Sequence, residues 1–532
     1  MSSTTESIPD LRPSFDRPSG WGTKLAIIAL ILAGLGYVAQ SLLADLDIAG
    51  SPARGWIPYF LLGLALFIAL GFEFVNGFHD TANAVATVIY THSLPPNIAV
   101  VWSGVFNFLG VLTSSGAVAF GIISLLPVEL ILEVGSSAGF SMVFALLIAA
   151  IIWNLGTWWL GLPASSSHTL IGSVIGVGIA NAMMRGVDGT SGVDWEQATK
   201  IGKTLLISPL VGFFAAGLLL LVMKKVITNP ALYREPHGKA PPPAWIRGLL
   251  ILTCTGVSFA HGSNDGQKGM GLIMLILVGT VPTAYALNHA VPANESVRFV
   301  ALTHVTAESL RATTTVTAPA NPREALTTYI RDKAFSPAVI PALASVTQAI
   351  GEEVGSRETL SSLAPETVSN VRNDMYLASE AIRILDKRHD VVLPAEAKAN
   401  LKAMKAELDH ATKFIPVWVK VAVAIALGLG TMVGWKRIVV TVGEKIGKTH
   451  LTYGQGAAAE LVAMTTIAAA DNFGLPVSTT HVLSSGVAGT MAANGSGIQM
   501  STVRSLALAW VLTLPVAILL SGSLYFLFRQ VF

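Results

Sequence analysis

The chain has 532 residues, of which 52% are hydrophobic and only 12% charged, whereas soluble proteins average about a quarter charged. Together with a mean hydropathy of +0.61, this composition excludes a soluble globular protein and indicates one that crosses a membrane several times. The net charge of +2 says nothing about partners, and a single cysteine, Cys254, excludes an internal disulfide and a cysteine-based metal cluster.

The chain opens with a tail, residues 1–24, followed by an apolar run over 25–43. This run is long enough to span a membrane and has no clear small-residue cleavage site before Asp45. We therefore predict a first transmembrane helix rather than a removed signal peptide. Later apolar segments predict an all-α polytopic protein with ten to twelve membrane segments, some of them re-entrant. The apolar segments are 25–44, 57–90, 97–126, 139–160, 162–183, 203–223, 246–289, 414–435, 455–471, 475–492 and 504–528.

Two polar breaks divide this pattern. The first, residues 224–247, is rich in Lys, Arg and Pro, and its basic excess places it in the cytoplasm. It separates a first membrane half, 25–223, from the start of a second half, 248–289. The second break, residues 290–413, shows helical periodicity and many helix-forming residues, so we predict a soluble helical insertion there. The rest of the second half follows at 414–532.

The side of the membrane on which the insertion lies depends on how segment 246–289 crosses. The basic residues of 436–448 mark the loop after segment 414–435 as cytoplasmic by the positive-inside rule. If segment 246–289 crosses once, the insertion is extracytoplasmic, and if it crosses twice, the insertion is cytoplasmic.

A polar stretch, 76–83, lies inside an apolar region and carries charged and amide side chains at membrane depth. Charged groups there cost at least a few kcal/mol each, so they are rare and usually functional. A second stretch, 261–269, lies in a similar setting, and the two align with Asp80 on Asp265. We expect three glycines of the second stretch to let the backbone unwind locally: Gly262, Gly266 and Gly269.

A second pair of stretches gives stronger evidence of an internal repeat. Residues 161–172, Gly-Leu-Pro-Ala-Ser-Ser-Ser-His-Thr-Leu-Ile-Gly, match residues 474–485, Gly-Leu-Pro-Val-Ser-Thr-Thr-His-Val-Leu-Ser-Ser. In each half of the chain the acidic stretch comes before the Gly-Leu-Pro stretch. Transporters are often built from repeats inverted across the membrane, with the binding site at the midplane between discontinuous helices. The sequence therefore predicts two inverted repeats around one site.

Each Gly-Leu-Pro stretch suits the start of an anion-binding helix. Gly and Pro end a preceding helix, Pro fits the first turn of a new one, and Ser or Thr caps it. Such a start presents free N–H groups, hydroxyl donors and a partial positive charge, which suit phosphate or sulfate. Hydroxyl-mediated helix packing is the alternative, and the duplication argues against it. The candidate hydroxyls are Ser165, Ser166, Ser167, Ser478, Thr479 and Thr480.

The acidic stretches suit a cation or a proton. Asp80, Asn83, Asn264 and Asp265 offer oxygen ligands for a hard cation such as Na⁺ or Mg²⁺, and the carboxylates can also take a proton. Carboxylates beside an anion site are useful only if a cation or proton travels too. We therefore predict coupled transport.

Other polar groups at membrane depth have two readings each. Lys268 can contact the anion or neutralise the carboxylate three residues before it, and Glu73 can carry a proton or bond a polar neighbour. Asp471 aligns with Trp158 in the repeat, so symmetry does not support it as a site residue. Four histidines have a reference pKa suited to proton handling, or serve to orient loops: His79, His168, His261 and His481.

These stretches resemble those of the PiT family of inorganic phosphate transporters, in particular its bacterial low-affinity Pit branch. The resemblance rests on 77–90, Gly-Phe-His-Asp-Thr-Ala-Asn-Ala-Val-Ala-Thr-Val-Ile-Tyr, on 262–273, on the two Gly-Leu-Pro stretches, and on 430–437 and 443–448. It covers nearly everything from about 57 to 528. The resemblance implies an all-helical inverted repeat with phosphate bound between the halves.

In the bacterial branch the resemblance also implies symport with protons, often of phosphate as a neutral metal complex. The wider family includes sodium-coupled members. Its Asn-Asp signature reads His79-Asp80 in the first copy here, and the second copy ends Gly-Gln-Lys. One copy therefore lacks oxygen ligands that a sodium site could use, which favours protons.

We therefore expect a multi-pass transporter of the plasma or inner membrane that imports inorganic phosphate by proton symport. No tightly bound cofactor is expected, and a divalent metal can accompany the phosphate. The expected partners are inorganic phosphate and membrane lipid, without nucleic acid, and a homodimer is left open. The expected substrate-binding residues are Asn83, Ser165, Ser166, Ser167, Asn264, Gln267, Lys268, Ser478, Thr479 and Thr480. The expected groups for the proton, cation or metal are Asp80, Asp265 and Glu73, with His79, His168, His261 and His481 as secondary candidates.

The sequence leaves several alternatives open. One is sodium-coupled phosphate transport, and another is a permease for sulfate or a further tetrahedral oxyanion. Sulfate cannot donate a hydrogen bond near neutral pH and phosphate can, so buried acceptors favour phosphate. An intramembrane hydrolase would use a Ser–His pair such as Ser165 and His168, but a duplicated nucleophile has no evident use, and no enzyme is expected. The insertion could dock a regulator, for which the sequence holds no motif.

Overall fold

The computed structural model describes residues 13, 15, 20–48, 56–80, 82–126, 131–132, 136–186, 188–236, 238, 240–355, 360 and 363–531, apart from a few side chains within these ranges. In this part of the chain every regular element is a helix, and one isolated bridge joins Gly447 to Ile498. The predicted all-α polytopic fold is confirmed.

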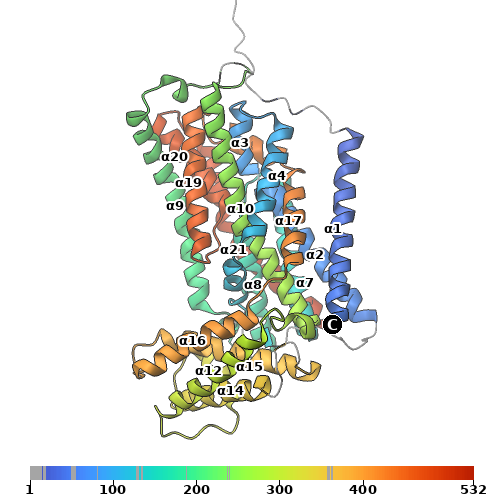
Figure 1. Cartoon of the computed structure of the whole chain (residues 1–532). Coiled ribbons are helices and arrows are strands. Elements are labelled where there is room, and N and C mark those ends of the chain that lie inside the picture. Colours follow the sequence, from blue (N-terminus) through green and yellow to red (C-terminus); the bar gives the residue numbers. More distant parts are fainter. Residues whose placement is uncertain are drawn as a thin grey trace, which may run out of the picture.

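The helices of the membrane bundle are long and mostly apolar (Figure 1). They are α1 (Trp21–Ile48), α2 (Trp56–Asp80), α3 (Ala82–Tyr90), α4 (Pro96–Thr113), α5 (Ala117–Ile123), α7 (Ser137–Trp159), α8 (Ser166–Met184), α9 (Trp195–Val226), α10 (Ala244–Thr280), α17 (Val417–Thr431), α18 (Lys436–Glu444), α19 (Tyr453–Asn472), α20 (Thr479–Asn494) and α21 (Met500–Val531).

A second group of helices packs together at one end of the bundle (Figure 1). They are α11 (Pro282–Tyr285), α12 (Ala293–Arg311), α13 (Pro322–Asp332), α14 (Val339–Gly355), α15 (Pro365–Asp386) and α16 (Ala395–Thr412). This group has a hydrophobic core of its own, which includes Leu326, Leu343, Met375 and Met404. Two short 3-10 helices, η1 (Gly189–Gly192) and η2 (Pro230–Tyr233), lie in connections of the membrane bundle.

Within the described residues, eight helices are long and apolar enough to cross a membrane, counting α2 and α3 as one span, and nine if the bent pair α16–α17 is one. Ten to twelve segments were predicted. The difference lies largely in α19 and α20, which pack in the bundle but are too polar or too short: α19 carries Gln455, Glu460 and Asp471, and α20 has 16 residues.

The two Gly-Leu-Pro stretches form the turns that their sequences predict. Gly161 and Gly474 have φ of +67° and +64°, a left-handed conformation that favours glycine. After each turn a serine caps a new helix: Ser165 accepts from the backbone N–H of His168 at 3.2 Å, and Ser478 from that of His481 at 3.1 Å. The starts of α8 and α20 are therefore set inside the bundle by local sequence.

The expected unwinding at the second acidic stretch is wrong, because α10 runs through all 37 of its residues without a break. Its glycines serve close packing instead. A Cβ at Gly262 would lie 2.1 Å from the carbonyl oxygen of Asn107, and one at Gly269 would lie 2.3 Å from Cγ of Glu73. Glycine at these points lets α4 and α2 approach the backbone of α10 closely.

The continuous α10 crosses the bundle once and leads directly to the helices of the insertion (Figure 1). The C-terminus lies at the same end of the bundle. The basic residues Lys436 and Arg437 belong to α18, which packs on α3 at the opposite end, where Lys224 near the end of α9 also bonds Asn494 at the end of α20.

Candidate functional site

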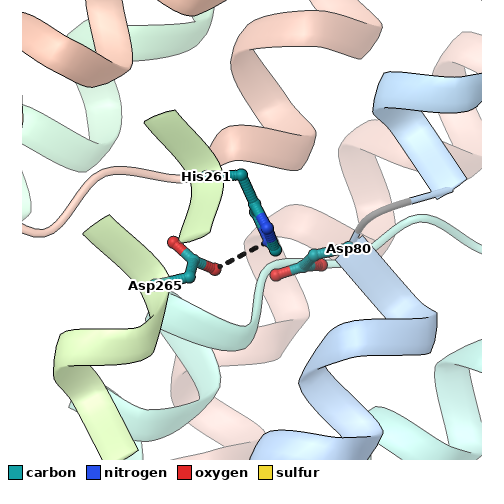
Figure 2. Close-up of side chains that lie close together, drawn as sticks. All are labelled: Asp80, His261 and Asp265. Atoms are coloured by element: carbon teal, nitrogen blue, oxygen red, sulfur yellow. Dashed lines mark ion pairs between the residues drawn. The ribbon is translucent and has the colours of Figure 1, made fainter. Parts of the chain in front are cut away.

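Two buried carboxylates from distant parts of the chain meet inside the bundle. Asp80 ends α2 and Asp265 lies in the middle of α10; they are 3% and 0% exposed. Figure 2 shows both side chains pointing toward each other, with His261 between them. Ligand atoms of these three residues lie within 4.8 Å of one another. The sequence predicted this convergence from the aligned polar stretches.

Asp80 accepts hydrogen bonds from both predicted helix starts. Ser166, the first residue of α8, donates to Oδ2 at 2.5 Å, and Thr480, near the start of α20, donates to Oδ1 at 2.8 Å. His79 Nδ1 lies 3.0 Å from the same Oδ1. One carboxylate thus joins the two Gly-Leu-Pro stretches, which we call the first hairpin (161–172) and the second hairpin (474–485).

Asp265 is paired with a lysine side chain. Lys268 Nζ lies 2.7 Å from Asp265 Oδ2 and also donates to the hydroxyl of Ser166 at 3.3 Å. Ser166 Oγ lies 3.5 Å from the same Oδ2, so this hydroxyl stands between the two acids. Lys268 therefore makes the ion pair with Asp265 that one of its two predicted roles requires, and its contact with an anion stays a prediction.

A chain of hydrogen bonds fixes the ring orientation of His261. Thr431 donates to the carbonyl of Leu427 at 3.0 Å and accepts from Nδ2 of Asn107 at 3.2 Å. This leaves Asn107 Oδ1, which can only accept, 2.8 Å from His261 Nδ1. The proton of a neutral imidazole is therefore on Nδ1. Nε2 then directs a lone pair toward Asp265 Oδ2, 3.4 Å away.

His79 is arranged in the same way. Its Nε2 lies 3.1 Å from the hydroxyl of Thr157, and that hydroxyl donates to the backbone carbonyls of Trp153 and Asn154 at 3.0 and 3.1 Å. Nδ1 faces the carboxylate of Asp80, so a proton on Nδ1 makes this contact a hydrogen bond or an ion pair. In both His–Asp pairs one ring nitrogen lies against a polar side chain and the other faces the acid.

The remaining predicted residues either bond the second hairpin or have no hydrogen-bond partner among the described residues. Asn264 donates to Leu475 O at 3.1 Å and accepts from the N–H of Val477 at 3.4 Å, so it braces the second hairpin. Ser167 braces it as well, donating to Val477 O at 2.8 Å. Thr479 is buried, and its hydroxyl has no hydrogen-bond partner among the described residues.

Gln267 and Glu73 lie beside the central cluster. Gln267 donates to Asp471 Oδ1 at 2.6 Å and accepts from the N–H of Val118 at 2.9 Å, and Ser263 donates to Asp471 Oδ2 at 2.5 Å. Asp471, which symmetry did not favour, therefore joins α19 to α10. Glu73 packs on Gly269, and its Oε1 has no hydrogen-bond partner in the described part of the chain.

Two further histidines meet between the helix starts. The rings of His168 and His481 have centroids 4.6 Å apart, and His481 stacks on Trp510 at 4.1 Å. The side chain of Asn83 lies outside the described residues.

Sequence reasoning missed Asn107, Thr431 and Thr157. Each is a polar residue inside an apolar segment, and all three are buried. A polar residue in a membrane helix commonly bonds a neighbouring helix, which was the available signal. Its partner is set by the packing of α4, α7 and α17, which sequence spacing does not reveal.

Buried carboxylates that meet inside a membrane bundle, flanked by two helices that start there, are typical of the binding site of a membrane transporter. A family model described as the phosphate transporter family matches residues 76–521, and the chain belongs to this family. The predicted resemblance to bacterial low-affinity Pit transporters is confirmed by its relatives.

The chain is 44% identical to the low-affinity inorganic phosphate transporter PitA of Escherichia coli strain K12 over 492 residues, which cover 88% of this chain and 97% of that protein. It is 42% identical to PitB of the same strain over 491 residues, with the same coverage. A probable low-affinity inorganic phosphate transporter of Bacillus subtilis strain 168 is 28% identical over 470 residues, 88% of this chain and 97% of that protein. A solved structure, the sodium-dependent phosphate transporter, matches 89% of this chain and 100% of its own with 20% identity and a TM-score of 0.48.

Proposed function

We propose that this chain carries inorganic phosphate across the membrane and that protons move with it. One observation carries the substrate assignment: Ser166 and Thr480, one hydroxyl from each helix start, both donate to the carboxylate of Asp80. Two helix starts that already share one oxyanion group have the donors and the partial positive charge to hold a phosphate. The relatives named as phosphate transporters support the same substrate.

The charge of the site requires a companion for the anion. Asp80 and Asp265 carry two negative charges and Lys268 one positive charge, a net −1 while the histidines are neutral. At about 4 Å, two like charges repel by about 4 kcal/mol at an effective dielectric constant of about 20. Phosphate binds beside these acids at lower cost once a proton or cation has neutralised one of them.

The orientation of the two histidines favours protons in this role. His79 and His261 each direct a ring nitrogen toward a carboxylate, and a proton on that nitrogen makes each contact an ion pair or a hydrogen bond. Of the two amides expected as oxygen ligands for sodium, Asn264 bonds the backbone of the second hairpin, and the side chain of Asn83 lies outside the described residues. The described residues thus supply better proton acceptors than sodium ligands.

A second candidate is phosphate that travels with a divalent metal. Asp80, His261 and Asp265 offer two carboxylates and one imidazole within 4.8 Å, a donor set that suits a divalent ion (Figure 2). The metal would be cargo, and Nε2 of His261 and the two carboxylates would contact it in place of the proton. Lys268, 2.7 Å from Asp265, would then be free to meet the phosphate.

We further propose that the helices of 290–413 form an extracytoplasmic domain. α10 crosses once, and the basic residues near the end of α9 and in α18 lie at the end of the bundle away from the insertion (Figure 1). The positive-inside rule then places that basic end in the cytoplasm. Phosphate released from the site toward α3 would enter the cell, and we propose that the two halves move against each other around the site.

Uptake of labelled phosphate into proteoliposomes tests the function. An inward proton gradient without sodium should drive uptake, an inward sodium gradient without a pH gradient should not, and excess sulfate should not compete. Uptake driven only by sodium would refute the proton assignment, and strong competition by sulfate would refute phosphate as the preferred oxyanion. Loss of uptake on chelation of divalent metal, with recovery on adding Mg²⁺, would favour the metal complex.

A further inference from the structure

Glu73 is a buried acid that the mechanism proposed above does not use. It lies on α2 about two helical turns before Asp80, on the same face of the helix, and it is 0% exposed. A Cβ at Gly269 of α10 would lie 2.3 Å from Cγ of Glu73 and 2.5 Å from its Oε1. The carboxyl group therefore lies inside the contact between the two helices that carry Asp80 and Asp265.

The hydrogen bonds of this carboxyl group are incomplete. Asn76, about one turn further along α2 and also 0% exposed, donates through Nδ2 to Oε2 of Glu73 at 3.4 Å. Oε1 of Glu73 and Oδ1 of Asn76 are both buried, and neither has a hydrogen-bond partner among the described residues. Two neighbouring acceptors thus lack a donor. A proton on Oε1 would turn that atom into a donor, and the amide oxygen of Asn76 is an acceptor on the next turn.

The charges around Glu73 do not favour its ionised form. It forms no ion pair within the described residues, and the charges of α10 that act on it, Lys268 and Asp265, pair with each other at 2.7 Å. On α2 itself the other charged groups are the His–Asp pair at its end. Of the other helices packed on α2, α17 carries only Lys420, which donates to a backbone carbonyl, and α8 only His168. α3 and α7 carry no acid, lysine, arginine or histidine. A buried carboxylate without a partner is costly, so such a site stabilises the neutral acid.

We propose that Glu73 holds a proton in this structure and that this proton travels with phosphate, which makes Glu73 a proton carrier separate from Asp80 and Asp265. The inference rests on the proposed proton-coupled transport of phosphate. While Glu73 is neutral, the two aspartates and Lys268 sum to a charge of −1, and ionisation of Glu73 makes the sum −2. Phosphate is an anion and therefore binds more readily to the form in which Glu73 is protonated. This preference couples the proton to the phosphate.

Proteoliposomes with the membrane potential held at zero and an interior about one pH unit more alkaline test this inference. The readout is the ratio of internal to external phosphate that just stops net uptake, and each coupled proton changes this ratio about tenfold. Glu73→Gln keeps the shape of the neutral acid but carries no proton, so its balancing ratio should be about tenfold smaller than that of the unaltered chain. Asp45→Asn is the matched control, because Asp45 accepts from Tyr285 and Trp418 at the end of α1, and this change should leave the ratio unaltered. Glu73→Asp, which keeps an acid, should restore the ratio.

Infrared spectroscopy of the purified full chain at neutral pH detects the proton itself. The carbonyl stretch of neutral carboxylic acids should be weaker in Glu73→Gln than in the unaltered chain and unchanged in Asp45→Asn. An equal balancing ratio in Glu73→Gln and the unaltered chain, or an equal infrared band, would overturn the proposal. A large fall in the melting temperature of Glu73→Gln at neutral pH would also overturn it, because glutamine matches the neutral acid and not the carboxylate. Failure of proton coupling as such looks different, since the balancing ratio of the unaltered chain would then not respond to pH.

Discussion

At the scale of single residues, the site is organised by the hydrogen bonds that orient the two histidines beside the acids. Asn107 and Thr431 reach back to a backbone carbonyl and so determine that Nδ1 of His261 is the donor. The hydroxyl of Thr157 lies 3.1 Å from Nε2 of His79. Both histidines thereby keep their other ring nitrogen beside a carboxylate. The groups that orient the histidines thus lie one residue beyond the acids themselves.

Removing either acid should abolish proton-driven phosphate uptake. Asp80→Asn and Asp265→Asn keep the size of the side chain but cannot take up a proton as a carboxylate does. Uptake under a pH gradient should fall to background for both variants. Phosphate exchange at equal pH on both sides separates the roles, because a group that only carries the proton can be lost without stopping exchange. Full gradient-driven uptake in either variant would make that acid structural.

Asn107→Leu should alter the pH profile of uptake without altering the acids. The change removes the acceptor for His261 Nδ1 and leaves a buried donor unpaired, which costs about 1–3 kcal/mol. We expect uptake at the optimal pH to fall by at most about tenfold, and we expect the optimum itself to move to another pH. Thr431→Val should give the same displacement to a smaller degree. An unchanged profile in both variants would show that the hydrogen-bond chain does not set the protonation of His261.

Much of this site could be predicted from one sequence, because the repeat places Asp80, Asp265 and the two hydroxyl stretches in equivalent positions. Symmetry alone did not distinguish residues that face the central cluster from residues that hold neighbouring segments in place. Asn264 and Ser167 bond the second hairpin, and Gln267 bonds Asp471. Symmetry also gave no weight to Asp471 or Asn107, because their roles arise from contacts between helices whose order in space the sequence does not state.

At the scale of elements, the sequence signals for helix ends predicted the structure correctly at the Gly-Leu-Pro stretches and wrongly in α10. The Gly-Leu-Pro stretches end and start helices where expected, since the left-handed glycine, the proline and the capping serine act locally. The glycines of α10 were expected to break it, but a glycine inside a helix has two uses, and only the neighbouring helices decide between them. In α10 they admit Asn107 and Glu73 to the helix surface.

Gly262→Ala should therefore destabilise the protein, whereas the same change at Gly248 should not. A methyl group at Gly262 would lie 2.1 Å from the carbonyl oxygen of Asn107, and backbone cannot easily yield. Overpacking of this kind costs about 1–3 kcal/mol. At Gly248 of the same helix nothing lies within 4 Å, and alanine is the better helix former. Melting in detergent should show a lower midpoint only for Gly262→Ala, and equal midpoints would contradict the close packing.

At the scale of the whole molecule, the insertion is tied to the membrane bundle by ion pairs. Asp194 caps α9, accepting from the N–H groups of Glu196 and Gln197 at 3.0 and 3.1 Å. It also pairs with Lys333 at 2.6 Å and Arg383 at 3.4 Å, both from the insertion. Because α9 packs along α20, the insertion is connected through one helix to the start that supplies Thr480.

Cysteine labelling can determine on which side of the membrane the insertion lies. In a Cys254→Ser background, a cysteine placed at Val392, which is 88% exposed, should react with a membrane-impermeant thiol reagent added to intact cells. A cysteine at Val226, 75% exposed at the basic end, should react only after the cells are opened. The reverse pattern would place the insertion in the cytoplasm, and phosphate released from the site toward α3 would then leave the cell.

The tie between insertion and bundle should weaken in acid through Asp194. Burial raises the pKa of this carboxyl, but the hydrogen bond from Lys333 and that from the N–H of Gln197, with the charges of Lys333 and Arg383, outweigh it and hold the pKa below its usual value. A depressed pKa contributes stability that is present above the unfolded value, about 3.9, and is lost as pH falls through the folded value.

Asp194→Asn should therefore lower the melting temperature at pH 7 and approach the unaltered chain as the pH falls below about 4. Asparagine still caps the helix, so this change isolates the charge, and Asp194→Ala should cost about 1 kcal/mol more at every pH. Asp386→Asn, at an exposed acid for which no ion pair is found in the described part of the chain, is the matched control. High salt should shrink the Asp194→Asn difference at pH 7, because partly exposed pairs are screened. A difference that persists unchanged in acid and in salt would mean that packing, not charge, joins the insertion to α9.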